Sequence, residues 1–273
     1  MKTLMPLFAA FAILASCNDS LSRKMEYPVT VTGNVADTIF GTIVPDPYRW
    51  LEDDRSDETA AWVKEQNRVT FGYLGKIPYR EEIRNRLTAM WNYEKYGIPS
   101  TEGGYIYFSR NDGLQNQYVV YRQKEGEEPE LFLDPNTFSA DGTISLGEIG
   151  FSRDGSKVAY SISEGGSDWR KVIVMDADTK EITGDTLKDI KFSGISWYGN
   201  EGFYYSSYDK PEGSELTAMT DHHKLYFHKL GTRQSDDQVV FGADSKRRYV
   251  SGYVTEDDRY LVVTASVSTT GNE

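Results

Sequence analysis

Gly150–Tyr160 reads GFSRDGSKVAY, and this stretch contains the unit that decides the fold. A strand-like run ends in the polar turn Ser152–Gly155, and a second strand follows at Lys157–Tyr160. Aspartate and glycine are typical of tight turns, whereas valine and tyrosine favour strands. The same order of run, polar turn and strand returns at Ser196–Tyr205 and at Tyr253–Val262. The sequence therefore contains a repeated β-hairpin.

Further strands extend the repeat. The strand after the turn occurs four times, at Tyr105–Phe108, Lys157–Tyr160, Gly202–Tyr205 and Arg259–Val262. A third strand follows at Tyr118–Tyr121, Lys171–Val174 and Lys224–Phe227, and a fourth at Leu131–Leu133, Asp185–Leu187 and Val239–Phe241. A self-similar unit of four short strands over about 40–50 residues predicts the blades of a β-propeller. A sandwich or jelly roll would show similar strand spacing without the repeated unit, so it is less favoured.

The repeats predict three blades and the beginning of a fourth. We therefore expect a mainly β protein in which residues 96–273 form a truncated propeller of about three and a half blades. An open propeller leaves edge strands unpaired, and the sequence stops in a loop-like run after Ser268. We expect the chain to be a fragment of a longer protein.

Residues 27–95 have helical patterns instead. Ser56 and Asp57 predict the start of a helix that runs to about Gly75, after an irregular, extended segment at Tyr27–Thr42. Pro78 predicts the start of a second helix. Its apolar stripe consists of Ile83, Leu87, Met90 and Trp91.

The first residues resemble a targeting segment. Lys2 is followed by an apolar stretch, Leu4–Ala15, which is too short to span a bilayer as a helix of about 20 residues. Leu14–Cys17 resembles a bacterial lipoprotein cleavage box, so we predict a signal peptide at 1–17, lipidation of Cys17 and a tether at 18–26. The alternative is an ordinary signal peptide with a chance cysteine. Either reading predicts export, and the first predicts a lipid anchor in a bacterial cell envelope.

Composition limits the partners. The net charge is −12 and the isoelectric point about 4.8, so nucleic acid and anionic membrane surfaces would repel the protein. We expect no nucleic-acid partner.

A further segment, Pro45–Asn67 or PDPYRWLEDDRSDETAAWVKEQN, mixes aromatic rings with charges and suits a surface laid against another domain. It resembles the N-terminal signature of the prolyl oligopeptidase family of serine peptidases. Five further runs resemble that family in the same order, at Asp112–Gln117, Phe132–Pro135, Phe151–Gly155, Gly166–Trp169 and His223–Tyr226.

The resemblance implies a parent enzyme that hydrolyses short peptides after proline without metal or organic cofactor. In that family a seven-bladed propeller covers an α/β-hydrolase domain that holds a Ser-Asp-His triad, and the N-terminal arm packs on the hydrolase domain. The implied partners of this chain are proline-containing peptides, its own hydrolase domain and, through Cys17, a membrane. An acylaminoacyl- or dibasic-specific branch of the family remains an alternative.

No catalytic residue is predicted in this chain. The sequence contains no G-x-S-x-G elbow, and its three histidines, His222, His223 and His228, all lie in or beside one predicted strand. Neighbouring residues of a strand point to opposite faces, so His222 and His223 are a poor metal-binding pair. We expect the 273 residues to be inactive alone.

Two positions match family residues that face the substrate cavity. The resemblance implies that Asp168 places negative charge near the peptide and that Phe192 offers an apolar contact. The alternatives are that Asp168 caps its turn and that Phe192 belongs to the blade core. Ala265–Val267 has no arginine where the family places one. The rival function is a non-catalytic propeller lipoprotein that binds peptides or a surface partner.

Overall fold

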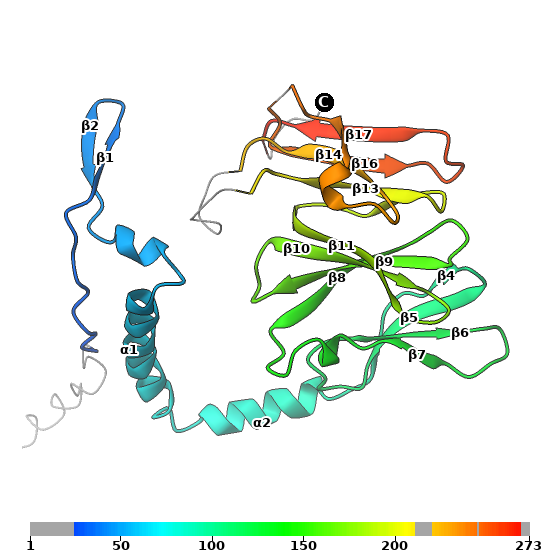
Figure 1. Ribbon diagram of the computed structural model, residues 1–273. Coiled ribbons are helices and arrows are strands. Elements are labelled where there is room, and N and C mark those ends of the chain that lie inside the picture. Colours follow the sequence, from blue (N-terminus) through cyan, green and yellow to red (C-terminus); the bar gives the residue numbers. More distant parts are fainter. Residues whose placement is uncertain (1–24, 211–219, 245, 269–273) are drawn as a thin grey trace, which may run out of the picture. The chain divides into compact units, whose positions relative to one another are not determined.

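The computed structural model describes residues 25–210, 220–244 and 246–268. The predicted signal peptide and Cys17 lie outside the described residues. The chain divides into two compact units that meet in sequence at Ile83 and Arg84. Figure 1 shows helices and one hairpin in the first part of the chain and stacked sheets in the second.

The described part of the first unit contains a β-hairpin that the sequence analysis did not predict. Strands β1 (Ala36–Ile39) and β2 (Thr42–Pro45) pair in an antiparallel register. The turn residues Phe40 and Gly41 have φ values of 49° and 82°. Two successive positive φ angles make a two-residue turn whose twist suits a hairpin. The expectation of an irregular extended segment at Tyr27–Thr42 was therefore wrong for its last residues, because a phenylalanine occupies a turn position where glycine or asparagine is the usual signal.

Two helices follow a short 3-10 turn, η1 (Arg49–Glu52). Helix α1 (Asp57–Leu74) begins where predicted, because the Ser56 hydroxyl accepts a hydrogen bond from the Thr59 backbone N–H at 3.1 Å. Helix α2 (Arg80–Trp91) begins two residues after Pro78, which lies in the preceding turn. Among the described residues, neither helix is long and apolar enough to cross a membrane.

The second unit confirms the predicted repeat. Its first sheet contains β3 (Lys95–Tyr96), β4 (Ser100–Glu102), β5 (Tyr105–Asn111), β6 (Val119–Gln123) and β7 (Glu130–Leu133). The second contains β8 (Ile144–Phe151), β9 (Lys157–Glu164), β10 (Trp169–Asp176) and β11 (Ile182–Lys191). The third contains β12 (Ser196–Tyr198), β13 (Gly202–Ser207), β14 (Lys224–Lys229) and β15 (Gln238–Phe241), and a fourth begins with β16 (Tyr249–Val254) and β17 (Leu261–Ser266). Within each of the second and third sheets every strand pairs with its neighbour in sequence, as in propeller blades.

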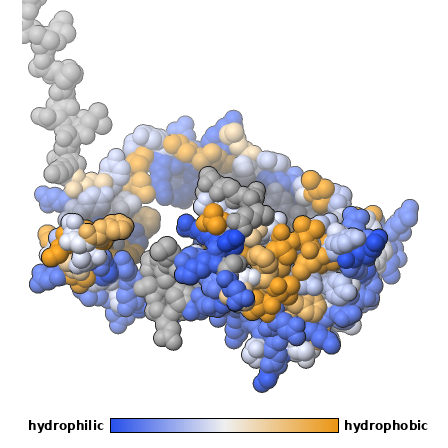
Figure 2. Space-filling model, turned by 90° about the horizontal axis from the view of Figure 1, so that it is seen from above, coloured by the Kyte–Doolittle hydropathy of each residue, from blue (hydrophilic) through white to orange (hydrophobic). Residues whose placement is uncertain are grey.

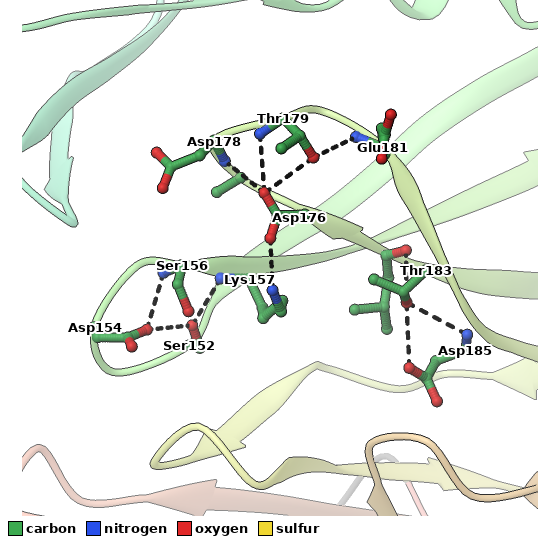
Figure 3. A network of polar contacts seen from close by, with 12 residues as sticks. Ser152, Asp154, Ser156, Lys157, Asp176, Asp178, Thr179, Glu181, Thr183 and Asp185 are labelled. Carbon is green, nitrogen blue, oxygen red and sulfur yellow. Dashed lines mark hydrogen bonds and ion pairs between the residues drawn. The ribbon is translucent and has the colours of Figure 1, made fainter.

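Polar contacts stabilise the turn between β8 and β9, the first two strands of the second blade. The Ser152 hydroxyl donates to an Asp154 carboxylate oxygen at 3.0 Å and accepts from the Lys157 backbone N–H at 2.9 Å (Figure 3). The Lys157 ammonium donates to Asp176 on β10 at 2.6 Å, and this hydrogen bond lowers the pKa of the Asp176 carboxyl. Side chains of the Gly150–Tyr160 hairpin therefore hold both its turn and the adjacent strand.

The blades stack through apolar cores between the sheets. One core, between the first and second blades, includes Tyr107, Phe132 and Val158. A second, between the second and third blades, includes Leu187, Trp197 and Phe203, and the Trp197 indole N–H also donates to the Gly150 carbonyl at 2.9 Å. A third, smaller core of Leu225, Val250 and Ala265 joins the third blade to the β16–β17 hairpin. The burial of these apolar side chains between neighbouring sheets holds the blades against one another.

Candidate functional site

The two predicted substrate-facing residues lie at the same end of the second blade. In the β10–β11 register, Trp169 pairs with Lys191. Asp168 directly precedes Trp169 and Phe192 directly follows Lys191, so they occupy the next opposed positions, just beyond the paired strands. The register therefore brings together two residues that are 24 positions apart in the sequence.

Asp168 is exposed in the turn between β9 and β10. The turn contains Gly165 and Gly166 with φ values of 59° and 76°, a conformation that glycine adopts without strain. The Ser167 hydroxyl accepts the Trp169 backbone N–H at 3.1 Å, and the Ser167 carbonyl accepts from Ser163 at 2.6 Å. Ser167 therefore caps the turn, which was the alternative role for Asp168. The Asp168 carboxylate lies on a turn that the hydrogen bonds of Ser167 stabilise.

Phe192 does not lie in the blade core. It follows the last residue of β11, has φ = 53°, and leaves 47% of its surface exposed. Its ring centroid is 6.3 Å from that of Tyr208, edge to face, and 6.0 Å from that of Tyr249. The Lys191 ammonium lies 5.2 Å from the Phe192 ring centroid and 5.0 Å from that of Trp169. These contacts leave part of an aromatic ring available to an apolar group.

The three histidines make separate contacts. The His222 ring bonds the Gly242 carbonyl at 2.6 Å, and the buried His223 ring bonds the Lys191 carbonyl at 2.9 Å. His228 is 1% exposed and lies between Asp237 at 2.9 Å and Asp185 at 3.4 Å. No group of three or more His, Cys, Asp or Glu side chains suited to a metal ion is found in the described part of the chain.

Protonation distinguishes the two buried histidines. Burial lowers the pKa of His223 to about 4, so the ring is neutral at pH 7. Burial also disfavours the charged form of His228, but its hydrogen bonds to Asp237 and Asp185 outweigh burial and raise its pKa. His228 therefore belongs to a buried ionic cluster between the second and third blades, whereas His223 acts as a neutral hydrogen-bonding ring.

At Ala265–Val267, where the family resemblance implied an arginine, the chain has an alanine, a serine and a valine. Ala265 and Ser266 are buried, and the Ser266 hydroxyl donates to the Ser268 carbonyl at 2.6 Å. An exposed arginine lies nearby instead: the Arg248 guanidinium is 5.9 Å from the Tyr249 ring centroid, and the Arg248 backbone N–H bonds the Ser266 carbonyl at 2.9 Å. The sequence analysis missed Arg248 and Tyr249. The RRY run at the start of β16 was the available signal.

Comparison with known proteins agrees with this architecture. The family model described as "Prolyl oligopeptidase, N-terminal beta-propeller domain" matches residues 27–273. Prolyl endopeptidases of Elizabethkingia miricola and Elizabethkingia meningoseptica are each 55% identical to this chain, over 100% and 97% of it. The alignments cover only 39% and 38% of those two proteins.

Solved structures show the same fold. A chain from a study of two prolyl endopeptidases, concerned with inter-domain dynamics in catalysis and specificity, has a TM-score of 0.77 and 30% identity over 90% of this chain and 37% of its own. Prolyl oligopeptidase B from Galerina marginata, bound to a 35-residue hydrolysis and macrocyclization substrate, has a TM-score of 0.74 and 29% identity over 90% of this chain and 38% of its own. The match along residues 27–273 and these identities show that the chain belongs to the prolyl oligopeptidase family, in which it corresponds to the N-terminal β-propeller region.

Proposed function

We propose that these residues are the N-terminal part of a serine endopeptidase that hydrolyses short peptides on the carboxyl side of proline. The observation that carries this proposal is the 55% identity to a prolyl endopeptidase across 100% of the chain. The chain spans about two fifths of that relative's length, and it contains no G-x-S-x-G elbow. The nucleophile, base and oxyanion donors of acyl transfer would therefore come from a hydrolase domain outside these 273 residues.

In this proposal the helical arm docks on the hydrolase domain. The apolar stripe of α2 supports that role, because Ile83, Leu87, Met90 and Trp91 are 50%, 59%, 57% and 63% exposed. A regular apolar stripe in water is unfavourable unless a partner covers it. A hydrolase domain is the partner that the family architecture supplies.

The propeller would limit access to the active site and contact the substrate. Asp168 would attract positive charge on a peptide, and the exposed part of the Phe192 ring would contact an apolar side chain upstream of the cleaved bond. Their adjoining positions at one end of the second blade support this assignment. Neither residue would take part in bond breaking, so their substitution should change KM more than kcat.

We also propose that Cys17 carries a lipid that anchors the protein in a bacterial cell envelope. Growth with a radiolabelled fatty acid should label the protein, and Cys17→Ser should abolish the label. Label retained in that variant would contradict the proposal.

Two measurements test the peptidase assignment. The coding sequence beyond Glu273 should encode further blades, then G-x-S-x-G with a later Asp and His; a stop codon directly after Glu273 would favour the non-catalytic lipoprotein. The purified 273-residue chain should not hydrolyse a proline-containing chromogenic peptide, whereas the product of the complete coding region should. Turnover by the purified 273-residue chain would show that the catalytic groups lie elsewhere than proposed.

A further inference from the structure

Phe192 has an unfavourable backbone conformation at an exposed position. A phenylalanine with φ = 53° is in the left-handed region, where its Cβ is crowded. Such a conformation persists only where the surroundings impose it, and it occurs in turns and at functional sites. Hydrogen bonds hold the residues directly before and after Phe192 in the chain. After it, the Ser193 hydroxyl oxygen accepts the Ser206 backbone N–H at 2.7 Å.

Before it, the Lys191 carbonyl is held by a histidine from another blade. The His223 Nε2 lies 2.9 Å from that carbonyl oxygen, and its Nδ1 accepts the Val250 backbone N–H at 2.8 Å. Only the neutral ring with its proton on Nε2 satisfies both bonds, and burial favours the neutral ring by lowering its pKa to about 4. One side chain of the third blade thus joins the end of β11 to β16.

The same ring also supports the aromatic contacts of Phe192. Tyr208 stacks on His223 with ring centroids 4.2 Å apart and planes 22° apart. Tyr208 also meets the Phe192 ring edge to face. The Tyr208 hydroxyl donates to the Arg248 carbonyl, next to Tyr249, whose ring also contacts Phe192. His223 therefore contacts the backbone before Phe192 and one of the rings beside it.

We infer that His223 is a positioning residue: it holds Phe192 in its left-handed, half-exposed conformation and thereby sets the recognition of apolar side chains upstream of the cleaved proline. The substrate part of this inference rests on the proposed function. His223 does not contact the substrate itself, since it is fully buried. Its effect on substrate recognition passes mainly through the Lys191 carbonyl and, to a smaller extent, through its stacking on the Tyr208 ring.

Two substitutions at His223 separate positioning from stability. Asparagine places an amide oxygen where Nδ1 lies, so His223→Asn keeps the Val250 bond and loses the Lys191 bond. Glutamine places an amide near Nε2, so His223→Gln keeps the Lys191 bond and loses the Val250 bond. Each variant loses the ring and one hydrogen bond, so both should lower Tm by similar amounts. A purely structural role would therefore affect both in the same way.

The kinetic test uses the protein produced from the complete coding region. Phe192→Ala should raise KM by about tenfold for a peptide with an aromatic side chain upstream of proline, and leave KM for the glycine analogue within about twofold. His223→Asn should raise KM for the aromatic peptide at least about fivefold with kcat nearly unchanged, whereas His223→Gln should stay within about twofold of wild type. The double variant His223→Asn/Phe192→Ala should be no worse than Phe192→Ala alone. Equal KM values for His223→Asn and wild type, or additive effects in the double variant, would overturn the inference.

A second readout does not need activity. Fluorine NMR of 4-fluorophenylalanine at position 192 should give one shifted line in wild type and in His223→Gln, and a line close to that of free 4-fluorophenylalanine in His223→Asn. If the complete protein does not cleave proline peptides, the proposed function fails, while the fluorine shift still decides whether His223 holds the ring. An unchanged shift in His223→Asn would contradict the positioning role directly.

A variant pair at Tyr208 covers the case in which the His223 variants do not fold. Tyr208→Phe keeps the ring between His223 and Phe192 and loses only the hydroxyl bond, so its KM should match wild type. Tyr208→Leu removes the ring, and it should raise KM for the aromatic peptide by about threefold or more. Identical KM values for these two variants would overturn the proposed link.

Discussion

Gly155 lies in the turn between β8 and β9 of the second blade, at a position without room for a side chain. Its φ is +71°, and a Cβ at this position would lie 2.4 Å from the Gly103 backbone nitrogen and Cα. Gly165 also has a positive φ, +59°, but a Cβ there would meet nothing within 4 Å. The two glycines therefore share the backbone requirement and differ in the space around them.

We predict that Gly155→Ala lowers the free energy of unfolding by about 3 kcal/mol or more, since backbone must move to admit the methyl group. Gly165→Ala should cost only about 1 kcal/mol, which is the strain of the left-handed conformation alone. Urea denaturation of both variants measures the difference. Equal losses would show that the contact between the first two blades does not restrict Gly155.

His228 lies in a buried charged cluster with Asp237 and Asp185. Its side chain and that of Asp237 are each 1% exposed, and its pKa is raised above the ordinary value of 6.5. A raised folded-state pKa contributes stability that is complete below about pH 6.5 and is lost as pH rises through the folded-state pKa.

Asp237→Asn should therefore cost about 3 kcal/mol at pH 6, where it leaves the buried imidazolium without the nearer of its two carboxylates, and less at pH 9, because the neutral ring becomes more populated as pH rises. Asp236→Asn is the matched control, because Asp236 is 48% exposed and pairs with the exposed Arg233. That control should change stability by less than about 1 kcal/mol at either pH. Unfolding free energies at the two pH values decide, and a loss for Asp237→Asn that is constant with pH would contradict the charged pair.

At the scale of elements, buried polar contacts reinforce the apolar stacking of blades. Arg122 on β6 is buried, with its side chain 4% exposed, and its guanidinium donates to the carbonyls of Ala177 and Asp178, just beyond β10. It also lies over the Tyr105 ring at 4.3 Å. Arg153 links two other elements, since it pairs with Asp258 at 2.8 Å, but its side chain is 45% exposed.

We predict that Arg122→Met lowers the free energy of unfolding by about 2–3 kcal/mol, because the change removes the hydrogen-bond donor from the buried Ala177 carbonyl. Arg153→Met should cost less than about 1 kcal/mol, since water replaces an exposed ion pair. Thermal or urea unfolding of the two variants tests the comparison. A larger loss for Arg153→Met would show that the exposed pair, rather than the buried arginine, holds the blades.

At the scale of the whole molecule, two apolar faces are uncovered in the described structure. One is the α2 stripe, and the other is the outer face of the β16–β17 hairpin, where Tyr253 pairs with Val262 and the two are 57% and 49% exposed. Hydrophobic residues gather on the face shown in Figure 2. Both faces are consistent with the proposal that further domains complete the protein.

The α2 stripe gives a prediction that compares two chain lengths. In the 273-residue chain, Leu87→Gln and Asn85→Gln should each change the free energy of unfolding by less than about 0.5 kcal/mol, because both positions are exposed. In the protein from the complete coding region, Leu87→Gln should cost about 2 kcal/mol or more, whereas Asn85→Gln should not. Calorimetry on both lengths measures this. A large loss in the short chain would mean that Leu87 is already buried there.

Local sequence signals were enough to predict most of the fold. The Asp-Gly turns and the alternating strands determine hairpins within a few residues of chain, so the blades were predicted close to their observed bounds. The start of α1 followed from one serine. The β1–β2 hairpin was missed because its turn residue, Phe40, carries no turn signal.

The repeat, the family resemblance and the two candidate site residues could all be found before the fold was known, because each depends on neighbours in the chain or on short motifs. The residues that surround Phe192 became known only from the folded chain. Tyr208, His223 and Tyr249 come from different strands or connections, and they meet because blades stack and the β10–β11 register ends at Lys191. Contacts between blades depend on packing at long sequence separation, and no local pattern encodes them.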